Sequence, residues 1–126
     1  MGNTSKKKIL LVDDDEIGLI ITENFLKRKY EIITARSGKE ALDHLLKGLV
    51  PDLVLLDIIM PNMDGWETYN RIKVISFLND VPVIFLTSIS SDFEKSLAEE
   101  MGANDYIIKP YEPKDLLKRI RKAIKT

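Results

Sequence analysis

The chain has 126 residues, 44% hydrophobic and 31% charged, which suits one soluble domain with a single core and excludes a two-domain protein. It contains no cysteine, which excludes disulfide frameworks, iron–sulfur clusters and cysteine nucleophiles and is compatible with a cytoplasmic location. Nineteen basic and twenty acidic residues give a net charge of −1, which argues against direct binding of nucleic acid. No apolar run approaches the ~20 residues of a membrane span, so no membrane insertion is expected.

Five short apolar runs predict β-strands. They are rich in Ile, Leu and Val and apolar throughout, which is typical of strands covered on both faces of a parallel sheet. The runs are Lys8–Val12, Glu31–Ala35, Leu53–Leu56, Val81–Leu86 and Tyr106–Ile108. Residues 1–7 are polar and basic and lack the apolar region of a signal peptide, so they form a lead ahead of the domain.

The longer stretches between these runs begin with helix-capping residues. Two are capping boxes, Ser37-x-x-Glu40 and Ser91-x-x-Glu94, and the other helix starts are Asp64-x-x-Glu67, the residues after Asp15, and Pro113, from which a terminal helix runs to about Lys125. Strand and helix alternate five times, which predicts a three-layer, doubly wound α/β domain, because each parallel connection crosses one face of the sheet.

Polar side chains follow four of the predicted strands. They are Asp13, Asp14 and Asp15 after the first, Asp57 after the third, Thr87 and Ser88 after the fourth, and Lys109 and Pro110 after the fifth. The ends of parallel strands meet at one edge of a sheet, so carboxylates, a hydroxyl and an ammonium group should converge there. An acidic run is usually a solvated turn or helix start, but Asp57 adds a carboxylate after a buried strand beside the first cluster.

Three carboxylates placed so closely would repel one another by about 4 kcal/mol per pair at an effective dielectric constant of about 20. A divalent cation that prefers oxygen ligands would relieve this repulsion. Mg²⁺ or Mn²⁺ suits such an all-oxygen site better than zinc or copper, so we expect one of these two ions as the cofactor.

Four segments together resemble the receiver domains of two-component response regulators. They are Ile9–Asp15, Asp57–Gly65, Leu86–Ser88 and Gly102–Pro110, in order and each at a strand end. The resemblance covers nearly the whole chain, and it implies a flavodoxin-like (βα)5 fold with strand order 2-1-3-4-5 and a receiver domain spanning residues 8–126.

The resemblance also implies roles for individual residues. Asp57 would accept a phosphoryl group from a sensor histidine kinase or a histidine phosphotransfer protein. Asp13, Asp14 and Asp57 would hold the metal with the backbone carbonyl of Ile59. Thr87 and Lys109 would contact the phosphoryl oxygens, with Lys109 followed by a cis peptide bond to Pro110. Tyr106 and Thr87 would form the switch, in which the aromatic ring moves inward as the hydroxyl is drawn to the phosphate.

The chemistry of these residue types agrees with the resemblance. Phosphoryl transfer is catalysed chiefly by positioning and by stabilisation of charge, which a cation and Lys109 can supply to a carboxylate nucleophile. We therefore expect a signalling switch rather than an enzyme, with intrinsic phosphoryl-transfer and autodephosphorylation activity, read out on the surface from Asp92 to Lys125. The resemblance implies that Ile59 and Ile89 would border the approach of the hydrolytic water, and because neither side chain can orient it, self-dephosphorylation should be slow.

Other residues carry weaker signals. The helix after Asp15 has more apolar residues than one stripe facing the sheet requires, so some of its apolar surface should be exposed; in receivers this helix docks the phosphohistidine partner. His44 is expected at the surface, and Trp66 is expected to pack beside the third helix. The basic face of the last helix is expected to be solvated.

Two other functions compete with this interpretation. A phosphatase of the haloacid dehalogenase type would use Asp13 as its nucleophile in Asp13-x-Asp15, but the acidic pair expected after a later strand is missing and Ile17 replaces the expected hydroxyl residue. A degenerate receiver that serves only as a scaffold is disfavoured because the acids, hydroxyl and lysine are all present. The sequence leaves open the kinase, the signal, the downstream effector and whether the chain stands alone or is part of a larger regulator.

Overall fold

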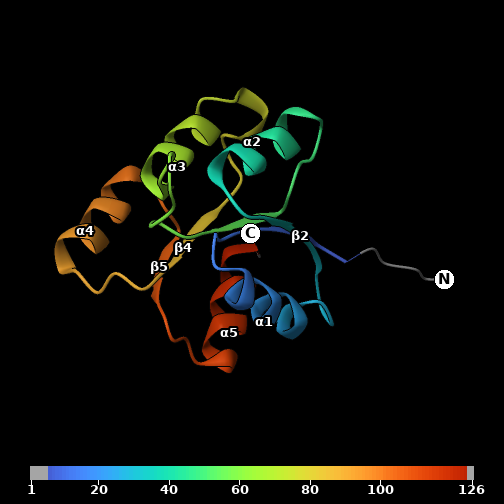
Figure 1. The fold of residues 1–126 in the computed structure, drawn as a ribbon, viewed down its shortest axis with the longest axis vertical. Helices are drawn as coiled ribbons and strands as arrows, with labels where there is room; N and C mark the ends of the chain where they lie inside the picture. The colour runs from blue at the N-terminus through green and yellow to red at the C-terminus, as the bar shows by residue number, and fades with distance from the viewer. Residues whose placement is uncertain (1–5, 125–126) are drawn as a thin grey trace.

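The computed structural model describes residues 6–124, in which strands and helices alternate along the chain (Figure 1). The strands are β1 (Lys8–Val12), β2 (Glu31–Ala35), β3 (Leu53–Leu56), β4 (Val83–Thr87) and β5 (Asp105–Ile108). The helices are α1 (Glu16–Leu26), α2 (Gly38–Leu46), α3 (Gly65–Lys73), α4 (Asp92–Met101) and α5 (Pro113–Ile124), with a short 3₁₀ helix, η1 (Ser76–Leu78), after α3.

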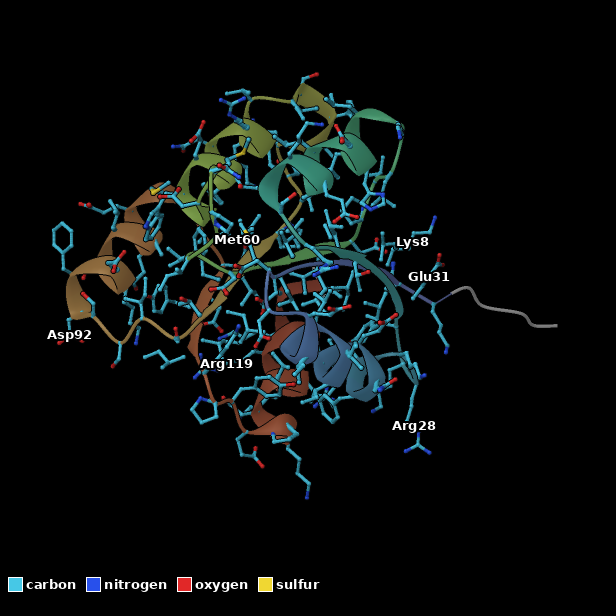
Figure 2. All side chains as sticks on the ribbon, viewed as in Figure 1. Lys8, Arg28, Glu31, Met60, Asp92 and Arg119 are labelled. Atoms are coloured by element: carbon cyan, nitrogen blue, oxygen red, sulfur yellow. The ribbon has the colours of Figure 1, made fainter. Side chains whose placement is uncertain are left out.

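The five strands form one parallel sheet in the order β2-β1-β3-β4-β5, which confirms the predicted doubly wound, flavodoxin-like fold. The register pairs Lys8 of β1 with Glu31 of β2, and these two residues lie side by side at one end of the sheet (Figure 2). Because all strands run in the same direction, the residues that follow them gather at the opposite edge of the sheet.

Helices cover both faces of the sheet, and alternate residues of each strand point into two separate cores (Figure 1). In β1, Leu10 and Val12 belong to the core under α2, α3 and α4, whereas Ile9 and Leu11 belong to the core under α1 and α5. All four are at most 2% exposed. The unbroken apolar character of the predicted strands therefore has its physical cause in burial on both faces.

The fourth strand differs at both ends from the predicted span, Val81–Leu86. It begins at Val83 because the Val81 N–H bonds to the carbonyl of Leu78 after η1, and Pro82 has no N–H to donate to the sheet. It ends at Thr87, which pairs with Ile108 of β5. The fifth strand begins one residue earlier than predicted, at Asp105, and η1 has no counterpart in the predicted elements.

Side-chain caps start three of the predicted helices. Ser37, Asp64 and Ser91 accept hydrogen bonds from the N–H groups of Glu40, Glu67 and Glu94. The two capping boxes are incomplete, because the Glu40 carboxylate accepts from the Arg36 N–H and the Glu94 carboxylate accepts from Trp66. Residues 1–5 of the predicted lead and Lys125 of the predicted terminal helix lie outside the described residues.

None of the helices in residues 6–124 combines the length and apolar character that a membrane crossing requires.

Candidate functional site

Asp13 and Asp57 are the first residues after β1 and β3, two neighbouring strands in the middle of the sheet. Hydrogen bonds continue the ladder at both positions: the Asp13 N–H donates to the carbonyl of Ala35 and the Asp57 N–H to that of Val12, each at 3.0 Å. The side chains are therefore fixed by the sheet itself. Asp13 is 5% exposed and Asp57 8% exposed, while Asp14 is open to solvent.

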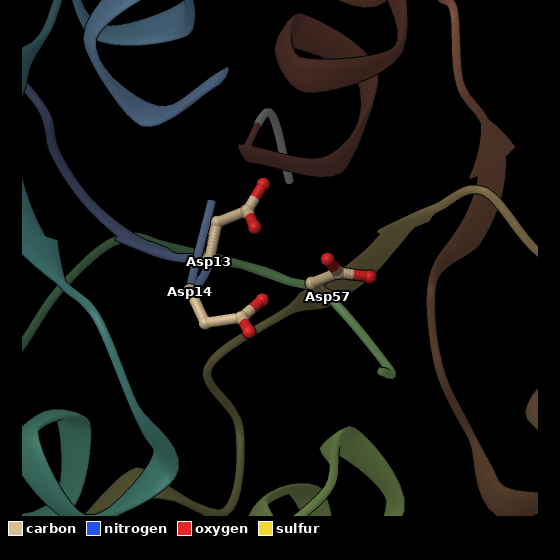
Figure 3. Close-up of side chains that lie close together, drawn as sticks. All are labelled: Asp13, Asp14 and Asp57. Carbon is tan, nitrogen blue, oxygen red and sulfur yellow. The ribbon is translucent and has the colours of Figure 1, made fainter. Parts of the chain in front are cut away.

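The three carboxylates converge on one space at the strand ends (Figure 3). One oxygen from each of Asp13, Asp14 and Asp57 lies within 4.8 Å of the others. The sequence predicted this cluster, and the geometry brings its members together.

Lys109, which follows β5, reaches across the edge of the sheet into this cluster. Its Nζ donates to Oδ2 of Asp13 at 2.6 Å and to Oδ2 of Asp57 at 3.4 Å. The peptide bond from Lys109 to Pro110 is cis, as the resemblance implied. One ammonium group thus faces three carboxylates, which leaves the cluster with an excess of negative charge.

Burial and charge shift the pKa values of both partners. Burial raises the pKa of Asp57 and the Asp13 carboxylate adds to this, while the Lys109 ammonium and the Ile58 N–H act in the opposite direction. Burial also works to lower the pKa of Lys109, but its bonds to Asp13 and Asp57 outweigh burial and raise it. Lys109 is therefore held as a cation, while the negative charge on Asp57 is under-compensated.

The carboxylate cluster suits a hard divalent cation. It offers only oxygen donors, two of its acids are nearly buried, and Lys109 is a single ammonium group beside three carboxylates. This donor set is the type that Mg²⁺ and Mn²⁺ prefer. Ile59, whose backbone carbonyl was expected to join the ligands, has a side chain that is 58% exposed.

Thr87 is fully buried, and its hydroxyl hydrogen bonds to the loop that follows β4. The Oγ1 atom accepts from the Ile89 N–H at 3.2 Å, and the carbonyl of Ile89 accepts from the Tyr106 hydroxyl at 2.8 Å. Tyr106 is only 4% exposed, so its ring already lies inward without phosphorylation, which differs from the inward movement that the resemblance implied for the switch. Thr87 and Tyr106 are thereby connected through one residue, Ile89.

Gly65 is a residue whose role the sequence did not reveal. A Cβ atom at this position would lie 2.2 Å from the carbonyl oxygen of Asp57 and 2.6 Å from the Cα of Ile58. The Gly65 N–H also donates to the carbonyl of Ile58 at 2.8 Å. Only glycine permits this close approach, which packs the start of α3 against the backbone that carries Asp57.

A cavity of about 570 Å³ adjoins the acidic cluster between α1 and the loop after β5. Asp13 and Lys109 form its polar end, and Ile21 and Pro110 contribute apolar surface. Thr22 and Tyr111 close it through a 2.9 Å hydrogen bond between their hydroxyl groups. These two residues, 89 positions apart, carried no signal in the sequence.

The apolar surplus predicted for α1 is present at the surface. Ile17, Ile20 and Ile21 are 71%, 49% and 59% exposed, whereas Leu19 and Leu26 are buried. Ile21 lines the cavity beside the acids. The exposed face of α1 therefore borders the candidate site.

Two of the weaker expectations meet different outcomes. His44 is half-buried rather than at the surface, because its Nε2 hydrogen bonds to the carbonyl of Thr34 at 3.2 Å. Trp66 lies in the first turn of α3 as expected, but its ring packs on Phe85 and its Nε1–H bonds to Glu94 on α4.

A five-stranded 2-1-3-4-5 sheet with a carboxylate cluster and a lysine at its carboxyl edge is the architecture of a phosphoacceptor domain. Residues 9–121 match the family described as response regulator receiver domain, and the chain belongs to that family. It is the receiver domain of a two-component response regulator, for which a phosphoacceptor role is typical.

Two similar proteins are longer than this chain and differ in their names. The chain is 38% identical over 122 residues to a probable transcriptional regulator from Guillardia theta, covering 96% of this chain and 46% of that protein. It is 44% identical over 110 residues to a probable cyclic di-GMP phosphodiesterase from Vibrio cholerae, covering 87% of this chain and 25% of that protein. The chain thus spans half or less of the length of these relatives.

A solved structure of a putative response regulator from Chloroflexus aurantiacus has the same architecture. It superposes with a TM-score of 0.90 at 32% identity, covering 97% of this chain and all of that one (100%).

Proposed function

We propose that this domain, spanning residues 8–126, accepts a phosphoryl group on Asp57 from the phosphohistidine of a sensor histidine kinase or a histidine phosphotransfer protein. The observation that carries the proposal is the position of Asp57: it is the buried carboxylate that lies within reach of both Lys109 and the two acids at the end of β1. Phosphoryl transfer depends on such positioning and charge stabilisation.

The two oxygens of Asp57 differ in their surroundings. Oδ1 accepts the N–H of Ile58 at 2.7 Å, while Oδ2 faces the Lys109 ammonium at 3.4 Å. In the proposed step one of the two Asp57 carboxylate oxygens forms a bond to phosphorus as the bond from phosphorus to the imidazole nitrogen breaks. The imidazole keeps the electron pair of that bond and takes up a proton.

Lys109 and Thr87 act on the transferred group. The Lys109 ammonium moves from Asp13 toward the phosphoryl oxygens, and the Thr87 hydroxyl turns from the Ile89 N–H to donate to one of them. These are charge-assisted hydrogen bonds, each contributing about 1.5 to 3 kcal/mol. Asp13, Asp14, Asp57 and the Ile59 carbonyl would hold Mg²⁺ or Mn²⁺, which supplies positive charge to the phosphoryl oxygens when bound.

The competing use of Asp13 as a nucleophile is disfavoured by its contacts. Oδ2 of Asp13 accepts from Lys109 at 2.6 Å, and Oδ1 accepts from the Asp15 N–H at 3.0 Å. The lysine contact of Asp13 is shorter than the 3.4 Å contact that Lys109 makes with Oδ2 of Asp57, which suits Asp13 as the residue that positions Lys109.

We propose that the exposed apolar face of α1, with the adjoining cavity, receives the phosphohistidine partner. Ile21 of this face lines the cavity together with Asp13, so a partner bound there would present its histidine to Asp57. A cytoplasmic location belongs to the same proposal and is supported by the absence of cysteine.

The output is proposed to be a change in the surface of α4, β5 and α5 toward a downstream effector. Two new bonds to the phosphate, from Thr87 and Lys109, approach the ~5.5 kcal/mol that inverts a 1:99 population. Thr87 is connected to Tyr106 through Ile89, which supports transmission of this change to β5 and α4.

The test is intact mass after incubation with acetyl phosphate and Mg²⁺. Wild type should gain one phosphoryl group and Asp57→Asn none. Asp43→Asn is the matched control, because it makes the same change in a carboxylate of α2 that pairs with Lys39 of the same helix, and it should label as wild type does. Equal labelling of Asp57→Asn and wild type would overturn the proposal.

A further inference from the structure

Helix α4 buries little of itself. Of its ten residues only Ala98 is fully buried, and Phe93 in its first turn is 76% exposed. The helix stands at the margin of the molecule beside α3 and β5 (Figure 1), with Asp92 at its outer end (Figure 2). Apolar burial is thus a weak constraint on the position of α4, and specific polar contacts carry more of that task.

Three aromatic side chains from outside the helix supply such contacts. Tyr69 of α3 donates its hydroxyl to the carbonyl of Met101 in the last turn of α4 at 2.8 Å. Trp66 of α3 donates its Nε1–H to Oε1 of Glu94 in the first turn at 3.1 Å. Tyr106 of β5 holds the preceding loop at Ile89. Both ends of α4 and the loop before it are therefore fixed by single hydrogen bonds.

Trp66, which donates the hydrogen bond to Glu94, is anchored on the side of the site that carries Asp57. Its ring centroid lies 4.8 Å from that of Phe85, which is fully buried. Trp66 also follows Gly65, whose backbone lies against Asp57 and Ile58. Phe85 belongs to β4, so the indole is held between this strand and, through Gly65, the backbone that carries Asp57.

Glu94, which accepts this hydrogen bond, is connected to the loop after β4. The Glu94 N–H donates to the Ser91 hydroxyl at 3.3 Å, and only three residues separate Ser91 from Thr87. A displacement of Thr87 toward Asp57 would pull this loop and the first turn of α4. The bond between Trp66 and Glu94 spans the junction between the fixed part and the part that moves.

We propose that Trp66 is a positioning residue that latches the first turn of α4, through Glu94, to the side of the site that carries Asp57. Occupation of Asp57 releases this latch. The coupling to Asp57 rests on the proposed function, whereas the latch in the unmodified protein does not. The chain has a single tryptophan, so its fluorescence reports on the surroundings of the Trp66 indole, which include Glu94 and Phe85.

The first test measures hydrogen exchange of the α4 amides in unmodified protein. Trp66→Phe and Glu94→Ala should each speed exchange about tenfold, and the double variant no more than either, because both remove one hydrogen bond. Glu94→Gln keeps an oxygen acceptor and should restore most of the protection. Asp92→Ala removes another first-turn carboxylate and controls for the helix dipole. If the α4 amides of Glu94→Ala exchange as slowly as those of wild type, the proposed latch is overturned.

The second test measures Trp66 emission as beryllofluoride and Mg²⁺ are added, with binding followed separately by fluorine NMR. The emission of Trp66 should change in wild type and in Asp92→Ala as beryllofluoride occupies Asp57, because the Glu94 carboxylate moves away from the indole. Glu94→Ala should bind beryllofluoride without this change. If wild type binds and its emission stays constant, Trp66 has no part in the coupling. If beryllofluoride does not bind at all, the proposed function fails while the exchange result still stands.

Discussion

At the scale of the residue, Asp57 carries a carboxylate and is nearly buried, and these two properties oppose each other in the resting protein. Its carboxylate is 8% exposed and lies beside Asp13, and burial raises its pKa despite the nearby Lys109 ammonium. A charged Asp57 therefore costs folding free energy that a divalent cation or a neutral side chain would save. The proposed function accounts for a carboxylate at this position, because a carboxylate acts as a nucleophile in its ionised form.

This cost makes a prediction for Asp57→Asn in buffer with a chelator and no divalent cation. The folded-state pKa of Asp57 is raised above its unfolded value, so its contribution to stability is present below the unfolded pKa and lost as pH rises through the folded pKa. Asp57→Asn should therefore unfold at a higher temperature than wild type at pH 7, with a smaller difference at pH 4. Thermal unfolding at both values checks this. A difference that grows on acidification would contradict it, and Asp43→Asn is the control.

Asp14 is the exposed member of the cluster, so its removal should separate metal binding from folding. Asp14→Ala should lose labelling by acetyl phosphate and Mg²⁺ while its unfolding free energy changes by no more than about 0.5 kcal/mol. Labelling by mass and unfolding by urea measure the two effects. Full labelling of Asp14→Ala would exclude this residue from the metal site.

The lifetime of the phosphorylated form is predicted to depend on Ile59 and Ile89. Both are apolar and β-branched, so neither can hydrogen bond and orient a hydrolytic water. The double variant Ile59→Asn, Ile89→Glu should lose phosphate about tenfold faster, which corresponds to about 1.4 kcal/mol of barrier. Release of phosphate from purified phosphorylated protein measures the rate. An unchanged rate would show that these two positions do not control hydrolysis here.

At the scale of the element, the helix starts place the site residues against the sheet. The closest approach is at α3, where Gly65 lies on the backbone of Asp57 and Ile58. At Gly38, the start of α2, an added Cβ would meet Thr68 Oγ1 at the same distance of 2.2 Å, but this atom belongs to a side chain, whereas the atoms met at Gly65 are backbone.

The two glycines therefore make a matched pair. Gly65→Ala should lower the unfolding free energy by about 1 to 3 kcal/mol, because backbone must move, and it should also slow the labelling of Asp57. Gly38→Ala should cost less and leave labelling unchanged. Urea unfolding measures the change in unfolding free energy, and the rate of mass gain measures the labelling of Asp57. Equal costs for the two variants would contradict the argument.

Local patterns in the sequence predicted the helices and strands well, but they predicted contacts between individual pairs of residues poorly. Continuous apolar runs predicted β1, β2 and β3 at the bounds the structure has, because burial on both faces leaves a direct mark in the sequence. The start of β4 was wrong because the apolar Val81 continues the run although its N–H closes a turn.

The same distinction holds at the site. Strand ends predicted the convergence of Asp13, Asp57 and Lys109, since the topology alone brings them to one edge. The hydrogen bond from Trp66 to Glu94 joins residues 28 positions apart, and its partners are set by how α3 and α4 pack. No periodicity or spacing in the sequence encodes such a contact.

At the scale of the whole molecule, two cores on opposite faces of the sheet hold one functional edge between them. Helix α1 presents apolar surface on one side of this edge, and the loosely buried α4 lies on the other. The proposed input and output surfaces are thus separate, with the strand ends between them.

This arrangement predicts where the domain changes when Asp57 is occupied. Amide chemical shifts should change from Asp92 to Ile124 on addition of beryllofluoride and Mg²⁺, whereas most of α2, on the far side of α3, should keep its shifts. Asp57→Asn should show neither effect. Shifts that stay constant from Asp92 to Ile124 in a protein that binds beryllofluoride would contradict the proposed output surface.

The central claim is that Asp57 takes the phosphoryl group, and the most direct measurement identifies the modified residue chemically. Protein labelled with acetyl phosphate and Mg²⁺ is reduced with borohydride, which converts an aspartyl phosphate to homoserine, and is then digested and sequenced by mass spectrometry. We predict homoserine at position 57 and unmodified aspartate at positions 13, 14 and 15. Homoserine at position 13, or labelled protein with aspartate retained at 57, would contradict the account.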